Sequence, residues 1–79
     1  MADLNKVELL DVTGLRCPLP VLKAARFCRG LATGTELVVQ ATDPMAELDF
    51  QHFCREKGHE FLGIEKSGEM LTIRLRVLV

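Results

Sequence analysis

The sequence predicts a two-layer α/β (α+β) sandwich, in which a four-stranded mixed sheet carries two helices on one face. Three observations support this fold class. The 79 residues provide for one hydrophobic core and little more, so we expect a single domain over residues 1–79. Apolar residues alternate at period two in some segments and recur at helical spacing in two others. The segments follow one another in the order βαβαββ, and right-handed crossovers then place both helices on the same face.

The first strand and the first helix are separated by a glycine turn. Residues 7–12 are rich in branched apolar side chains and stop at the turn signal that contains Gly14. From Pro18 onward, apolar residues recur at three- and four-residue steps, which predicts a helix. Gly30 and Gly34 bracket its end, and the basic residues of its last turn suit the negative end of the helix dipole.

A second strand and a second helix follow. Alternation predicts the strand over residues 35–42. Asp43 is then expected as the N-cap of the helix, with Pro44 at the first helical position. Gly58 closes this helix, because glycine readily adopts the left-handed conformation of a helix end.

The last two strands are expected to form a hairpin. The third covers about residues 59–66 and meets a turn at Ser67 and Gly68. The fourth has the cleanest alternation in the chain. Its apolar side chains point one way, and its polar ones point to water or to a partner: Leu71, Ile73, Leu75 and Val77 against Thr72, Arg74 and Arg76.

Composition argues against several classes of partner and site. The net charge is -1, and the chain has four Phe but no Tyr or Trp. It lacks the basic field and the stacking rings of nucleic-acid binders, so no direct nucleic-acid ligand is expected. Its apolar runs are far shorter than the ~20 residues that span a bilayer, so no membrane partner is expected. With no visible signal peptide and only three cysteines, we expect a reducing cytoplasmic location.

The chemistry is concentrated in residues 11–20, where a strand ends, a glycine loop turns and a cysteine precedes a helix. Cys17 is expected at or next to the helix N-cap, where free N–H groups and the helix dipole favour an anion. Pro18 suits the first helical position, because its missing N–H would have no partner there. The dipole would lower the thiol pKa, and Arg16 would add to this if its side chain folded toward the sulfur. The pattern predicts an exposed, nucleophilic thiol able to carry a persulfide.

The remaining thiols and imidazoles have weaker claims to function. Cys28 and Cys54 lie on apolar helix faces, where core packing is the common fate of a free cysteine. The cysteine spacing gives no metal site, since there is no Cys-x-x-Cys or His-x₃-His pair. His52 is expected on a helix flank. His59 begins a strand, and a general-base role is only a minor alternative for it.

With these residues in place, the chain resembles the TusA-like (SirA-like) sulfurtransferase family. The family's aspartate, glycine and Cys-Pro-x-Pro signature corresponds to Asp11, Gly14, Cys17, Pro18 and Pro20. Further matching residues cover nearly the whole chain: Gly34, Asp43-Pro44, Asp49, Phe53-Cys54 and Gly58-His59. Independently of the resemblance, Asp11 is predicted to order its loop by accepting N–H groups, and Gly14 to supply a backbone conformation that other residues resist.

The resemblance implies a fold similar to the C-terminal domain of a bacterial translation initiation factor, with the last strand inside the mixed sheet. It also implies that Cys17 accepts sulfur as a persulfide from a cysteine desulfurase or a rhodanese-like donor. Cys17 would then pass the sulfur to an acceptor protein in a relay, such as tRNA thiolation, molybdenum-cofactor synthesis or sulfur oxidation. No cofactor is expected, because the sulfur is carried covalently on the cysteine.

Three apolar residues near the two helix starts are candidates for binding these partners: Leu15, Leu19 and Met45. Exposed apolar groups beside a reactive thiol are better explained by docking than by folding. Leu19 stands where tRNA-thiolation members often carry an acid, and Leu48 where they often carry a basic residue. The resemblance therefore leaves the pathway, the donor and the acceptor open.

Two other classes of function are consistent with the same fold. One is a regulatory module that acts only through protein contacts, and the other is a redox thiol that forms mixed disulfides. A pure binding module has no need of a thiol at position 17. A mass increase of one sulfur atom separates a carrier from a redox thiol.

Overall fold

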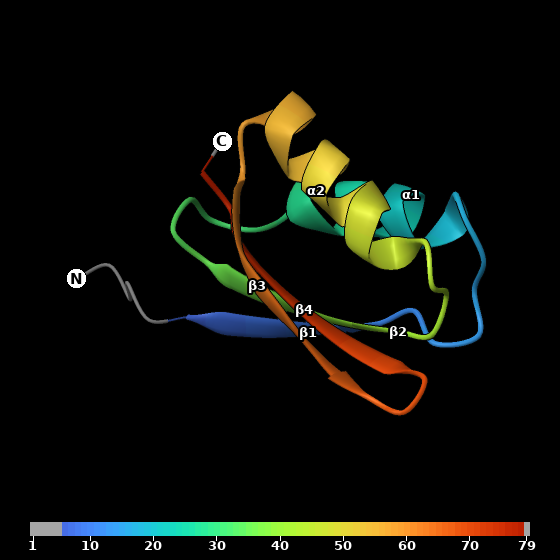
Figure 1. The fold of residues 1–79 in the computed structure, drawn as a ribbon. Coiled ribbons are helices and arrows are strands. Elements are labelled where there is room, and N and C mark those ends of the chain that lie inside the picture. The colour runs from blue at the N-terminus through green and yellow to red at the C-terminus, as the bar shows by residue number, and fades with distance from the viewer. Residues whose placement is uncertain (1–5, 79) are drawn as a thin grey trace.

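The computed structural model describes residues 6–78, so the domain expected over residues 1–79 has its first five residues and Val79 outside the described part. The elements follow in the predicted order, βαβαββ, and both helices lie on one face of the sheet (Figure 1). The strands are β1 (Val7–Asp11), β2 (Glu36–Ala41), β3 (Glu60–Ser67) and β4 (Met70–Arg76), and the helices are α1 (Leu19–Cys28) and α2 (Ala46–Lys57). The predicted two-layer fold class is confirmed.

The sheet is mixed, with the strand order β1-β2-β4-β3. β1 and β2 run parallel, and α1 supplies the crossover that a parallel pair requires. β4 runs antiparallel to both β2 and β3. The last strand therefore lies inside the sheet, as the resemblance implies, and the two helices run side by side in the same direction (Figure 1).

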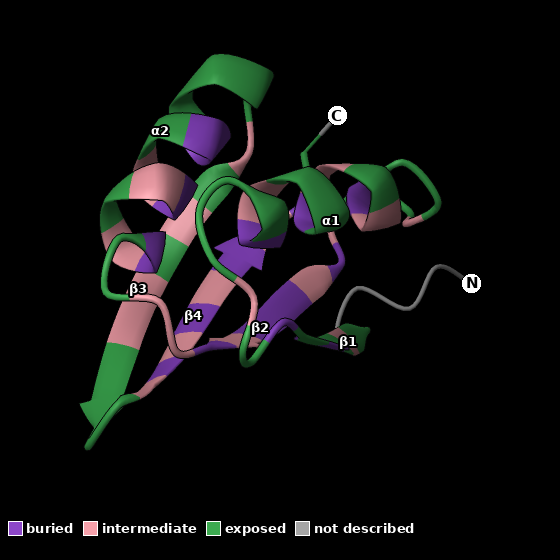
Figure 2. Ribbon diagram, turned by 90° about the vertical axis from the view of Figure 1, so that its right-hand side faces the viewer, coloured by how far each residue is buried: buried purple, intermediate pink, exposed green. Residues whose placement is uncertain are grey.

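The core lies between the sheet and the helices, where buried segments of both layers face each other (Figure 2). It follows the predicted periodicities, with alternate residues of β2 and β4 packed under one face of each helix. These residues include Leu37, Val39, Ile73 and Leu75 from the strands and Ala24, Cys28, Phe50, Phe53 and Cys54 from the helices. The prediction that Cys28 and Cys54 are core residues is confirmed. Burial raises the pKa of both thiols, that of Cys54 to about 11, so neither is a ready nucleophile.

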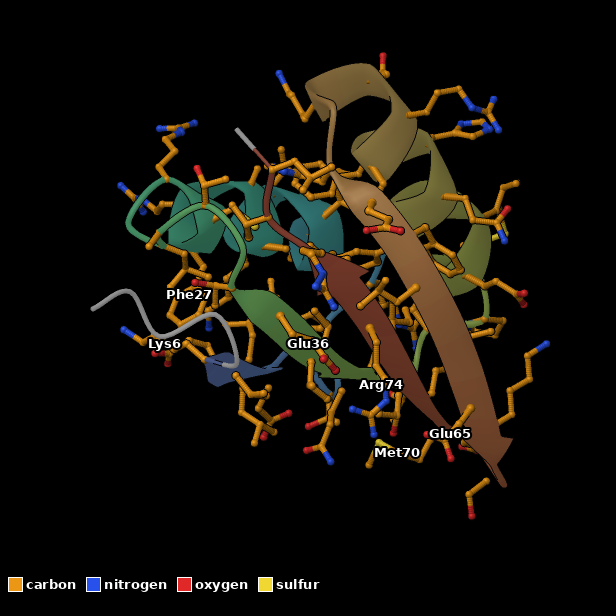
Figure 3. All side chains as sticks on the ribbon, turned by 90° about the vertical axis from the view of Figure 1, so that its left-hand side faces the viewer. Lys6, Phe27, Glu36, Glu65, Met70 and Arg74 are labelled. Carbon is orange, nitrogen blue, oxygen red and sulfur yellow. The ribbon has the colours of Figure 1, made fainter. Side chains whose placement is uncertain are left out.

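The open face of the sheet carries ion pairs. Arg74 lies between Glu36 on β2 and Glu65 on β3 (Figure 3), with N–O distances of 3.1 and 3.5 Å. Arg76 Nε lies 3.9 Å from a carboxylate oxygen of Glu60. Exposed pairs of this kind contribute little to stability, because solvent screens the charges. The arginines point away from the core as predicted, but acids on neighbouring strands engage them.

Both helices begin later than the sequence predicts. Pro18 is the N-cap of α1 rather than its first residue, because the Leu19 N–H donates to the Arg16 carbonyl (2.8 Å) and closes a turn. The N-cap of α2 is Met45, not Asp43, and Pro44 lies in the preceding turn. The remaining boundaries differ from prediction by a few residues, within the usual uncertainty of element ends except that α1 ends earlier than expected.

The hairpin turn is shifted by one residue from its predicted position. Ser67 still belongs to β3 and pairs with Met70, so the turn consists of Gly68 and Glu69. Gly68 has a φ of 59°, a left-handed conformation that glycine adopts without steric cost.

Asp43 ties the loop before α1 to the loop before α2. Its Oδ1 accepts the Met45 N–H (3.1 Å), and its Oδ2 accepts the Cys17 N–H (2.5 Å). Beside it, the Thr42 hydroxyl accepts the Gly14 N–H (2.9 Å). Because these bonds link residues 26 and 28 positions apart, they hold the Cys17 loop against the start of α2.

We expect Asp43→Ala to lower the free energy of unfolding by about 1–2 kcal/mol, because two N–H groups lose a charged acceptor at a partly exposed position. Asp43→Asn keeps one acceptor oxygen and should lose less. Urea denaturation of both variants measures the difference. An Asp43→Ala midpoint equal to that of the wild type would show that these bonds do not hold the loops.

His59 binds the backbone of Leu78, which follows β4. Its Nδ1 accepts the Leu78 N–H (3.2 Å), and its ring lies 5.5 Å from the Phe53 ring. Burial lowers the pKa of His59, because the charged imidazolium is less well solvated there. Protonation at Nδ1 would also remove the acceptor of the Leu78 N–H.

This arrangement predicts a stability that depends on pH. The unfolded chain binds the His59 proton more readily than the folded one, so the contribution is complete above the unfolded pKa of about 6.5 and is lost as the pH falls below it. We expect His59→Asn, whose amide oxygen can accept the Leu78 N–H, to remove part of the fall in unfolding free energy between about pH 6.5 and 5. His52→Asn, at an exposed position on α2, serves as the control and should keep the whole fall. Equal pH profiles for His59→Asn and the wild type would contradict the assignment.

Candidate functional site

Cys17 is the exposed cysteine among the three, and it lies in the turn directly before the N-cap of α1. Its peptide bond to Pro18 is cis. Pro20 is buried at the second position of the helix, so the start of α1 is packed down while the thiol stays outside. The structure thus places Cys17 at an accessible rim, where the sequence predicts it.

The thiol lies at one end of a groove between the two helices, with a volume of about 570 Å³. Because α1 and α2 run in the same direction, the groove extends from their N-terminal ends, at Cys17 and Asp49, to their C-terminal ends, near Arg29 and His59. Apolar side chains form most of its walls, among them Val21, Leu22, Ala25 and Phe53. His59 lies at the far end, which separates it from the thiol by the length of α2.

The electrostatics of the thiol differ from the prediction. The carboxylate of Asp49 raises the pKa of Cys17, since it accepts the thiol proton in a hydrogen bond and repels a thiolate; partial desolvation and the charge of Asp43 act in the same direction. The expected lowering by the helix dipole is therefore wrong as the net effect. In the free protein, these effects favour the neutral thiol of Cys17 over the thiolate.

The start of α1 has few N–H groups to offset these acids. Pro18 and Pro20 have no N–H, and the Leu19 N–H is engaged by the Arg16 carbonyl. The Cys17 N–H itself is engaged by Asp43. Arg16 is exposed, and its charge is not among those that shift the thiol pKa, so the assistance considered for it is absent. The prolines that define the motif thus also remove the donors that would favour a thiolate.

The other motif residues shape the loop before Cys17. Asp11 Oδ1 accepts both the N–H (2.9 Å) and the hydroxyl (2.7 Å) of Thr13, and these bonds lower the pKa of Asp11. Gly14 has a φ of 81°, which favours glycine at this position. Asp11 therefore acts as a local acceptor, as expected from the sequence, and not as an acid near the thiol.

The three apolar candidates differ in exposure. Leu19 and Met45 are 52% and 48% exposed, whereas Leu15 is partly buried against the core. Leu22, one of the apolar residues that recur along the first helix, is 58% exposed on the wall of the groove. Leu48 is also exposed at the start of α2. Several apolar side chains therefore surround the thiol end of the molecule.

Asp49 is the residue whose relation to Cys17 sequence reasoning missed. It was singled out only as part of the resemblance. A usable signal was present, because two parallel helices on one face of a sheet bring their first turns to the same end, and Asp49 lies in the first turn of α2.

A metal site and a membrane-spanning helix are two further features to consider within residues 6–78. No group of three or more His, Cys, Asp or Glu side chains in this part of the chain is placed to hold a metal ion. Neither helix of the described chain combines the length and the apolar character needed to cross a membrane.

Comparison with known proteins gives consistent results. The family model described as Sulfurtransferase TusA matches residues 8–77. The sulfur carrier protein TusA of Pseudomonas entomophila is 48% identical over 68 residues, covering 86% of this chain and 85% of that protein. The sulfur carrier protein TusA of Pseudomonas putida is 45% identical over 62 residues, 78% of each chain.

A solved structure agrees at the level of the fold. The SirA-like protein from Desulfitobacterium hafniense aligns with a TM-score of 0.72 over 92% of this chain and 99% of that one, at 20% sequence identity. The family match over almost the whole described chain and the closely similar relatives lead to one conclusion: the chain belongs to the TusA sulfurtransferase family.

Proposed function

We propose that this protein is a sulfur carrier that accepts sulfur as a persulfide on Cys17 and passes it to an acceptor protein. The observation that supports this most directly is the contrast among the cysteines. Cys17 is exposed at the end of an apolar groove, whereas Cys28 and Cys54 are buried with raised pKa values. Relatives that are 45–48% identical bear the name sulfur carrier protein.

The proposed loading step exchanges one sulfur–sulfur bond for another. The Cys17 sulfur attacks the outer sulfur of a donor persulfide, the donor's sulfur–sulfur bond breaks, and its electron pair stays on the donor sulfur. In balanced form, Cys17–SH and R–S–S⁻ give Cys17–S–S⁻ and R–SH, with no net oxidation. No cofactor takes part, because the sulfur remains covalently bound throughout.

The proposal includes two partner proteins, a sulfur donor and a sulfur acceptor. A cysteine desulfurase or a rhodanese-like protein would act as donor, and a further protein would act as acceptor. The exposed side chains of Leu19, Leu22, Met45 and Leu48 near the thiol support a docking surface for them. The chain is then a sulfurtransferase that depends on its partners, working as one domain in the cytoplasm, and tRNA thiolation is one relay that it could serve.

Cys17→Ser should fold normally and take up no sulfur, because serine cannot form a persulfide and residue 17 is exposed. Cys28→Ser and Cys54→Ser are the matched controls. They should lose about 1–3 kcal/mol of stability, since each buries a hydroxyl, but should still take up sulfur while folded. The measurement is intact mass after incubation with a cysteine desulfurase and cysteine, with circular dichroism as the test of folding.

A gain of one sulfur atom by folded Cys17→Ser, or its loss in folded Cys28→Ser, would show that another residue carries the sulfur. A wild-type protein that forms only mixed disulfides would support the redox alternative. If the wild type gains no sulfur, and the Cys17→Ser variant binds the partners as well as the wild type does, the result would support the regulatory alternative.

The docking surface is tested by Leu19→Glu. A charge at this 52%-exposed position should slow transfer to or from at least one partner, while stability changes by about 0.5 kcal/mol or less. Leu62→Glu, on β3 and 38% exposed, places the same charge outside the surface and should leave transfer unchanged. Transfer rates for Leu19→Glu that equal the wild type with every tested partner would refute the docking assignment.

A further inference from the structure

Asp49 is the acidic side chain that faces the Cys17 thiol across the end of the groove. It comes from the first turn of α2, and its backbone N–H donates to the Met45 carbonyl (3.0 Å), which fixes the position of its Cα at the helix start. Cys17 and Asp49 line the same end of the cavity. The residue is partly buried, and it is among those that line the groove.

The two acids near the thiol, Asp43 and Asp49, differ in the groups that they contact. Both carboxylate oxygens of Asp43 accept backbone N–H groups, from Cys17 and Met45. Within residues 6–78, Asp49 has no ion pair with a basic side chain, and it lines the groove together with Cys17. Asp43 is therefore committed to the backbone, whereas Asp49 is available to the sulfur.

Other charged or titratable groups along the groove lie toward its middle and far end. They are Cys28 and Arg29 from α1, His52, Glu56 and Lys57 from α2, and His59 after it. None of them is among the groups that shift the pKa of the Cys17 thiol. The charged groups that act on the thiol pKa are thus the two acids at the near end, Asp49 and Asp43.

We infer that Asp49 is the proton shuttle of the loading step: it takes the thiol proton when the Cys17 sulfur attacks and delivers that proton to the departing donor sulfur. This inference rests on the proposed function. The shuttle completes the balance given above, because the proton lost by Cys17–SH is the one gained by R–SH. A carboxylate is regenerated after each transfer, so Asp49 is not consumed.

The arrangement separates two kinds of reactivity. A simple electrophile reacts with the thiolate, which Asp49 disfavours. A persulfide donor needs a proton on its leaving sulfur, and Asp49 supplies it. The same carboxylate therefore suppresses alkylation and promotes sulfur uptake, and its removal should move the two rates in opposite directions.

The experiment compares Asp49→Asn with the wild type in two reactions of Cys17. With iodoacetamide, the variant should react faster at neutral pH, and its pH–rate curve should shift to lower pH, since the neighbouring negative charge is gone. With glutathione persulfide as the sulfur donor, its uptake of sulfur should be slower by about a hundredfold, the lower end of what a general acid–base group contributes. Glutathione persulfide does not depend on protein docking, so a lost contact with a partner cannot produce this result.

Glu47→Gln is the matched control, because it removes a carboxylate from the same helical turn as Asp49. The Glu47 carboxylate pairs with Lys66, and Glu47 does not line the groove. It should change neither rate. Asp49→Ser also lacks the carboxylate and should repeat both changes seen with Asp49→Asn. Rates that both rise, both fall or both stay equal in folded Asp49 variants would overturn the shuttle. Sulfur uptake by Cys17→Ser in the same assay would instead count against the carrier residue itself.

Discussion

The site depends on one carboxylate that is not itself reactive. Asp43 receives N–H groups from Cys17 and Met45, and so joins the loop after β1 to the loop after β2. In a parallel βαβ unit the two loops leave their strands at the same edge of the sheet, so they lie near each other. This proximity alone does not define the distance between them. The two bonds to Asp43 turn that approximate neighbourhood into a defined one. Without them, the thiol and the first turn of α2 would be held by the bond between Gly14 and Thr42 and by the packing of the two helices.

The groove and the acids give the thiol end of the molecule two properties. The walls of the groove are mostly apolar, which suits docking, and the acids beside Cys17 raise the pKa of its thiol, which favours the protonated sulfur. Pro18 and Pro20 contribute to the second property by omitting N–H groups from the start of α1. The position of the Cys-Pro-x-Pro motif at a helix start predicts a site that favours an anion. The surroundings of Cys17 instead favour the neutral thiol.

The sequence was sufficient for the element order, the sheet face of each strand and the burial of Cys28 and Cys54, because periodicity reports directly on the core. It was insufficient for Asp43. An Asp before a helix normally caps that helix, and only the three-dimensional proximity of the residue 17 loop reveals the second acceptor role. The same limit applies to Asp49 and the thiol pKa, because both follow from side chains that meet across a groove between separate helices. The exposure of Leu22 has a simpler reason: the apolar side chains of α1 cover a wider face of the helix than the core does.

The burial of Cys28 and Cys54 has a consequence for how a pool of this protein can be described. With two of three thiols buried under the helices, the proposed function leaves each folded molecule one position, Cys17, at which a persulfide can form. The pool is then a mixture of two species, empty and filled, with no partly loaded forms between them. Its filled fraction is set by the ratio of supply to withdrawal, so one number, the occupancy, records the balance between the reactions on either side.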